Sequence, residues 1–151
     1  MQSSYLLVND LRFHYYAANL EDGIRPALLL HGLASNARIW EKTAPFLAAG
    51  GLALYAPDLR GHGLTDKPDG DYGFDVFMRD LAAFADACDL KRPILIGHSW
   101  GAMLALEYAA RFAIGPRAPA ALALVDGGTV QLDDIPDVTW EMVREMLTPP
   151  K

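Results

Sequence analysis

The stretch that decides the fold runs from Pro93 to Gly101 and reads PILIGHSWG. Its first half is a short apolar run typical of a buried strand, and a helix-forming segment follows it. Ser99 stands between the two with Gly97 and Gly101 on either side, which is the sequence form of a nucleophile elbow. The pattern predicts a sharp turn that exposes the Ser99 hydroxyl at the amino end of a helix, where an oxyanion is stabilised. The alternative interpretation is that residues 97–101 form a structural glycine-serine loop at the start of a helix and not a nucleophile elbow.

Length and composition indicate one domain with a buried core. The chain has 151 residues, 52% of them hydrophobic, and a formal net charge of −6. These values argue against disorder and disfavour nucleic acid and membrane surfaces as partners. Cys88 is the only cysteine, so no disulfide within the chain is possible, and we expect it to be a small core residue. We expect no signal peptide, no membrane span and a cytoplasmic location.

Strand-like and helix-like segments alternate along the chain after an initial hairpin. The hairpin is expected at 5–8 and 11–16, and later strands at 27–30, 52–56, 93–97 and 120–125. Helices are expected at 37–49, 74–89, 100–112 and 139–147. This alternation predicts an α/β fold with a mostly parallel sheet.

Three motifs in order make the sequence resemble the α/β-hydrolase superfamily, and more closely its esterase-like members with a lid. They are His31-Gly32, the stretch DLRGHG at 58–63, and GHSWG around Ser99, each after a predicted strand. The resemblance covers about residues 5–128. It implies the N-terminal portion of that fold, truncated after the sixth strand. By the same resemblance, residues 1–130 would form an incomplete core domain and residues 131–151 the start of the lid region.

The resemblance also implies roles around Ser99. Ser99 would be the nucleophile, and the backbone N–H groups of Leu33 and Trp100 would be the oxyanion-hole donors. His31 could alternatively be a base, although in the family it usually supports its loop from inside. The site-supporting residues are expected to be His31, Gly32, Gly97, His98 and Gly101.

The other polar residues of these motifs are interpreted as structural. Asp58 and Arg60 can pair with each other or cap nearby backbone groups. His62 is interpreted as a loop histidine without a catalytic role, and His14 as a surface residue of the hairpin. The four histidines show no recognised metal-ligand spacing, so we expect neither a metal nor another cofactor.

A serine at position 99 favours acyl transfer. Dehalogenases and epoxide hydrolases of the superfamily place an aspartate there, whereas serine indicates an acyl-enzyme formed from a small-molecule ester, thioester or lactone, or a related C–C cleavage. The triad of this fold runs serine, acid, histidine along the chain. Asp126 is a candidate acid, and an aspartate that caps a loop is an equal alternative. No histidine follows His98, so we expect the base to lie outside this sequence and the isolated chain to have little or no activity.

The segment from Ala120 to Val125 suggests a hypothesis of a different class. It would be an apolar strand at the edge of the sheet, and an unprotected edge invites pairing with another chain. The protein could therefore be a non-catalytic binding or assembly module that forms a homodimer or holds a complementary chain at this edge. It could also be a truncated product without an independent role.

Overall fold

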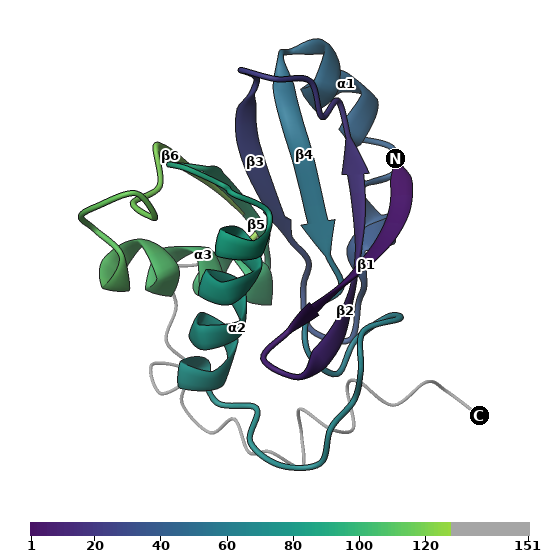
Figure 1. Ribbon diagram of the computed structural model, residues 1–151, viewed down its shortest axis with the longest axis vertical. Coiled ribbons are helices and arrows are strands. Elements are labelled where there is room, and N and C mark those ends of the chain that lie inside the picture. The colour runs from purple at the N-terminus through teal and green to yellow at the C-terminus, as the bar shows by residue number, and fades with distance from the viewer. Residues whose placement is uncertain (128–151) are drawn as a thin grey trace.

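The computed structural model describes residues 1–127, which form a six-stranded sheet with helices on both faces (Figure 1). In the order of the sheet, the strands are β1 (Gln2–Val8), β2 (Leu11–Ala18), β4 (Leu52–Pro57), β3 (Arg25–Leu30), β5 (Ile94–His98) and β6 (Ala121–Val125). The helical elements are η1 (Ala37–Trp40), α1 (Ala44–Ala49), α2 (Phe74–Ala87) and α3 (Trp100–Arg111). β2 runs antiparallel to both its neighbours, and β4, β3, β5 and β6 are parallel. The predicted fold class is confirmed.

The hairpin forms where the sequence predicts it. Asn9 and Asp10 have φ values of 48° and 63°, which two-residue turns of type I′ require at both central positions. The turn brings Val8 opposite Leu11 and sets the register of the two strands.

The helix predicted over residues 37–49 is wrong in its extent, because η1 and α1 replace it. Pro45 has no N–H to donate to the Glu41 carbonyl, so a continuous helix would lose a hydrogen bond at this point. The Asn36 side chain caps η1 by accepting from the Arg38 N–H. Pro45 instead lies in the first turn of α1, where a missing N–H costs nothing.

Alternate side chains of β3 belong to two apolar cores on opposite faces of the sheet. Leu28 and Leu30 pack in the core that α2 and α3 cover, and Figure 1 shows these two helices side by side. Ala27 and Leu29 pack on the other face, with residues of η1 and α1. Because both faces are covered there, the strand is apolar and buried from Ala27 to Leu30. Its carboxyl end is held beside that of β5, with Leu30 opposite Gly97.

β6 is the edge strand of the described sheet, and β5 is its one neighbour there. Leu122 and Val125 are 38% and 45% exposed, in contrast to the buried residues of β3. Among residues 1–127, no helix has the length and hydropathy needed to cross a membrane. The helix predicted at 139–147 and the lid region predicted at 131–151 lie outside the described residues.

Candidate active site

Ser99 occupies a strained turn between β5 and α3. Its φ and ψ are 53° and −118°, and a positive φ is uncommon for any residue other than glycine. The Ser99 N–H donates to the Val125 carbonyl at 2.9 Å, and the Ser99 carbonyl accepts from the Ala102 N–H at 2.9 Å. The elbow is therefore held from β6 on one side and from α3 on the other. It places Ser99 at the carboxyl edge of the parallel strands.

The glycines near Ser99 show how closely the surrounding segments approach it. A Cβ atom added at Gly32 would lie 3.3 Å from the Ser99 Cβ and 3.2 Å from His98 Nδ1. A Cβ atom added at Gly127 would lie 2.9 Å from the Ser99 carbonyl oxygen. The loops after β3 and after β6 thus both reach the elbow; a side chain at Gly127 would require a shift of the elbow backbone, and one at Gly32 would fit only tightly.

The two segments that carry the predicted backbone donors meet at the elbow. Trp100 is the first residue of α3, so its N–H has no acceptor within the helix. Leu33 follows Gly32 in the loop that contacts Ser99, and its side chain is 45% exposed. These two segments can offer the pair of N–H groups that an oxyanion requires.

An aromatic cluster beside Ser99 was not predicted from the sequence. The Trp100 ring lies 4.8 Å from the Phe74 ring and 5.9 Å from the Phe77 ring, measured between centroids. Both phenylalanines come from the first turn of α2. The Trp100 indole nitrogen is buried and has no hydrogen-bond partner among the described residues. A helical pattern identifies Phe77 as a core residue but does not show that the start of α2 faces the elbow.

His31 supports its loop from inside. Its ring is fully buried; Nδ1 donates to the Gly32 carbonyl at 2.8 Å, and Nε2 accepts from the Leu59 N–H at 3.0 Å. Burial lowers the pKa of His31 to about 4, so the imidazole is neutral at neutral pH. Both ring nitrogens are engaged, which leaves none free to take a proton from Ser99.

The buried neutral state of His31 predicts a loss of stability in mild acid. In the unfolded chain His31 binds a proton near its ordinary pKa of 6.5, but in the folded chain only near 4. Between these values the unfolded state binds more protons, so the free energy of unfolding falls as the pH falls from 6.5 to 4. The neutral state of His31 thus contributes about 3 kcal/mol to the free energy of unfolding at neutral pH, and this contribution is lost below pH 4.

Urea unfolding at pH 7, 5.5 and 4 checks this prediction. We expect His31→Asn to be less stable at pH 7 and to lose this part of the pH dependence. His62→Asn is the control, because it removes a loop histidine 5.1 Å away from His31 between ring centroids and should keep most of the pH dependence. An unchanged pH dependence in His31→Asn would contradict the assignment.

Asp58 joins three separate segments. It accepts hydrogen bonds from the backbone N–H groups of Ala37 at 2.7 Å and Leu64 at 2.8 Å, and from His14 Nδ1 at 2.8 Å. The prediction that His14 lies on the surface of the hairpin is wrong, since its side chain is fully buried. Asp58 accepts the hydrogen bond from the His14 ring N–H, and this bond offsets the free-energy cost of burying a polar ring.

Of the two alternatives given for Asp58 and Arg60, a pair between them is absent among the described residues, and only Asp58 caps backbone N–H groups. Arg60 donates instead to Asp80 on α2, with Nε 2.7 Å from Oδ2. Asn9 of the hairpin turn donates to the same carboxylate at 3.0 Å. His62 Nδ1 donates to the Arg60 carbonyl at 2.8 Å. This network fixes the loop after β4 against α2 and the hairpin.

No histidine nitrogen within residues 1–127, a range that includes all four histidines, forms a hydrogen bond with the Ser99 hydroxyl. His98 directly precedes Ser99, and its buried Nδ1 has no partner in this range. Asp126 follows β6 and is exposed, with a φ of 54°. It lies at the same sheet edge as Ser99 because Val125 pairs with His98. The described residues therefore place the elbow, the loop that contains Leu33, and Asp126 at one edge of the sheet, and no histidine among them contacts the Ser99 hydroxyl through a hydrogen bond.

Comparison with known proteins decides the family. The family described as "alpha/beta hydrolase fold" matches residues 26–147. The chain belongs to this family. The predicted resemblance to the α/β-hydrolase superfamily and the fold that it implies are thereby confirmed.

Relatives of this chain carry several different names. A haloalkane dehalogenase of Mesorhizobium japonicum is 43% identical over 84 residues, which are 56% of this chain and 27% of that protein. A non-heme chloroperoxidase of Streptomyces lividans is 35% identical over 117 residues, 77% of this chain and 42% of that protein. The crystal structure of epoxide hydrolase A from Mycobacterium thermoresistibile matches with a TM-score of 0.74 and 28% identity, over 82% of this chain and 38% of that chain. The chain thus spans less than half the length of each.

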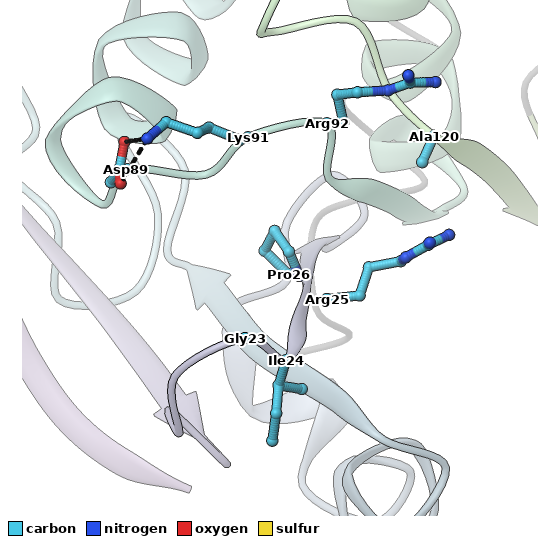
Figure 2. A pocket seen from close by; sticks show the side chains of 8 residues that line it. All are labelled: Gly23, Ile24, Arg25, Pro26, Asp89, Lys91, Arg92 and Ala120. Carbon is cyan, nitrogen blue, oxygen red and sulfur yellow. Dashed lines mark hydrogen bonds and ion pairs between the residues drawn. The ribbon is translucent and has the colours of Figure 1, made fainter.

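A pocket of about 590 Å³ lies at the other end of the sheet (Figure 2). The side chains of Arg25 and Arg92 line this pocket and come from the amino ends of β3 and β5. The Lys91 Nζ atom lies 3.1 Å from the Asp89 carboxylate. Ser99 follows the carboxyl end of β5, so this pocket is not part of the elbow site. Residues 1–127 contain no group of three or more His, Cys, Asp or Glu side chains arranged to hold a metal ion.

Proposed function

We propose that this chain carries the nucleophile of a serine hydrolase that acts on a small carboxylic ester or a related acyl compound. The observation that carries the proposal is the position of Ser99, on a strained strand-to-helix turn that the Gly32 loop contacts. The Ser99 oxygen would attack the acyl carbon and form an acyl-enzyme. The Leu33 and Trp100 N–H groups would stabilise the oxyanion that develops.

The identity of the elbow residue favours this reaction over those named for the dehalogenase and epoxide hydrolase relatives. An aspartate that displaces a halide or opens an epoxide becomes an ester, which water can hydrolyse. A serine that did the same would become an ether, which water does not cleave under such conditions. Ser99 is consistent with turnover only if the bond that it forms is an ester, and acyl transfer forms one.

The half-buried Phe74 and Trp100 rings favour a small apolar group on the substrate. They lie 4.8 Å apart beside the nucleophile, and the buried Phe77 ring packs against Trp100 from inside. An aryl or short alkyl group held against them would place its ester carbonyl at Ser99.

Turnover also needs a base that takes the Ser99 proton. We propose a histidine from outside this sequence, oriented by Asp126 or another acid. In the isolated chain Ser99 would then be a weak nucleophile. Added imidazole can take the role of the absent ring, so labelling of Ser99 by an alkyl fluorophosphonate with and without imidazole tests this function.

A second candidate function is assembly through β6, and the exposure of Leu122 and Val125 at the sheet edge favours it. An edge strand presents unpaired backbone groups that a second copy of the chain can complete. We expect light scattering to show a dimer at micromolar concentration. Leu122→Lys should shift it to a monomer, because a charge at the edge opposes pairing. Leu106→Lys is the matched control on α3, where the side chain is 41% exposed. A monomeric parent chain would contradict assembly.

A further inference from the structure

A second serine of this chain is the first member of a hydrogen-bonded series of serine, histidine and aspartate. The Ser3 hydroxyl oxygen lies 2.9 Å from His14 Nε2, and His14 Nδ1 lies 2.8 Å from Asp58 Oδ2. The three residues come from β1, from β2 and from the loop after β4. Their atoms follow the order of a catalytic relay, in which one ring nitrogen faces the hydroxyl and the other faces the carboxylate.

Asp58 determines which nitrogen of His14 carries the hydrogen. A carboxylate only accepts, and Asp58 already accepts from the backbone N–H groups of Ala37 and Leu64. His14 must therefore donate to it from Nδ1. In the neutral ring Nε2 then has a free lone pair, and that lone pair faces the Ser3 hydroxyl. The ring is ready to take a proton from Ser3.

The burial of the series differs from one end to the other. Asp58 and His14 are buried, whereas Ser3 is exposed. The Tyr5 and Tyr16 rings hold the imidazole from two sides, at 5.0 Å and 4.8 Å between ring centroids. The base is thus fixed and shielded from water, and the hydroxyl is accessible to a molecule in solution.

An apolar surface continues from Ser3 along the same face of β1. Alternate residues of a strand share a face, so Tyr5 and Leu7 lie in line with Ser3. Their side chains are 47% and 71% exposed. The Arg12 guanidinium lies over the Tyr5 ring, 4.7 Å from its centroid. This face offers contact to an aryl or alkyl group beside the hydroxyl.

We propose that Ser3 is a second acyl acceptor of this protein, with His14 as its base, and that it reacts with activated aryl or alkyl esters. The Ser3 oxygen attacks the ester carbonyl carbon while the hydroxyl proton passes to His14 Nε2. The bond from that carbon to the leaving oxygen then breaks, and the imidazolium returns the proton to the leaving oxygen. The products are acyl-Ser3 and the free alcohol or phenol. This site is independent of Ser99 and of the function proposed for it.

An alkyl fluorophosphonate tests the proposal, because its phosphorus accepts the serine oxygen while fluoride leaves. Trypsin separates the candidates, since Ser3 and Ser4 lie in residues 1–12 and Ser99 lies in residues 92–111. Ser4 is the matched control, because its side chain points to the opposite face of β1, away from His14. A positioned base contributes about 10²–10⁴ in rate. We therefore expect Ser3 to be labelled at least about tenfold faster than Ser4.

Two variants and a pH profile complete the test. Ser3→Ala should abolish labelling of residues 1–12, and Ser4→Ala should leave it unchanged. The rate at Ser3 should rise with pH and then level off, because the imidazole rather than hydroxide takes the hydroxyl proton. Asp58, Tyr5 and Tyr16 are the titratable groups that face the ring. An unassisted hydroxyl would show a rate that keeps rising with hydroxide concentration.

The proposal is overturned by equal labelling of Ser3 and Ser4, by no label in residues 1–12, or by a rate without a plateau. Each result is read from the peptide 1–12, so it stands apart from the outcome at Ser99.

Discussion

Replacing Gly97 with alanine is expected to lower the free energy of unfolding by about 3 kcal/mol or more. An added Cβ would overlap the Gly101 carbonyl group and lie 2.6 Å from the Ala102 Cα. All of these atoms belong to the backbone of α3, so no side chain can move aside to make room. Either β5 or α3 would have to shift, which would distort the elbow. A domain of this size has only about 5–15 kcal/mol of stability to lose.

Gly50→Ala is the matched control for this substitution. Gly50 follows α1 with a φ of −76°, and an added Cβ would come no closer than 3.3 Å to the Leu47 carbonyl oxygen. We expect this variant to lie within about 1 kcal/mol of the parent chain. Urea unfolding followed by circular dichroism gives both values. A Gly97→Ala variant as stable as Gly50→Ala would show that β5 and α3 do not approach as closely as described.

The features that could be predicted from the sequence are those that neighbouring residues determine. The turn at Ser99 depends on an apolar run, two glycines and a helix-forming segment, all within a few positions. The hairpin depends on Asn9 and Asp10 in the same way. The break between η1 and α1 at Pro45 could also have been predicted, because a proline inside a helical pattern ends or kinks the helix.

The features that could not be predicted depend on contacts between distant residues. His14 is polar and lies in a strand of mixed pattern, which is typical of an exposed face. It is buried because Asp58, 44 positions later, accepts its N–H. The pairing of Arg60 with Asp80 on α2 likewise depends on how the loop after β4 packs. No local pattern identifies these partners. From the sequence alone, such residues are therefore predicted to lie on the surface or to pair with each other.

Ser99 in the isolated chain is expected to react slowly at neutral pH, and this is the largest effect on reactivity that we predict. Loss of a triad member lowers catalysis by roughly 10⁴-fold or more. His14 and His31 are held by other groups, and His62 donates to the Arg60 carbonyl. The strained turn and the backbone donors position the hydroxyl but do not remove its proton. Without a base, the rate should rise with hydroxide concentration, about tenfold per pH unit.

The most direct measurement is the rate at which an alkyl fluorophosphonate labels residues 92–111 of the chain, in which Ser99 is the one serine. Ser99→Ala is the control and should remove the label from this peptide. We predict that Ser99 is labelled slowly at pH 7, that the labelling rate shows no plateau between pH 7 and 9, and that imidazole increases this rate severalfold. Rapid, stoichiometric labelling of Ser99 at pH 7 without imidazole would contradict this prediction, because a base that reaches Ser99 would then already be present within the chain.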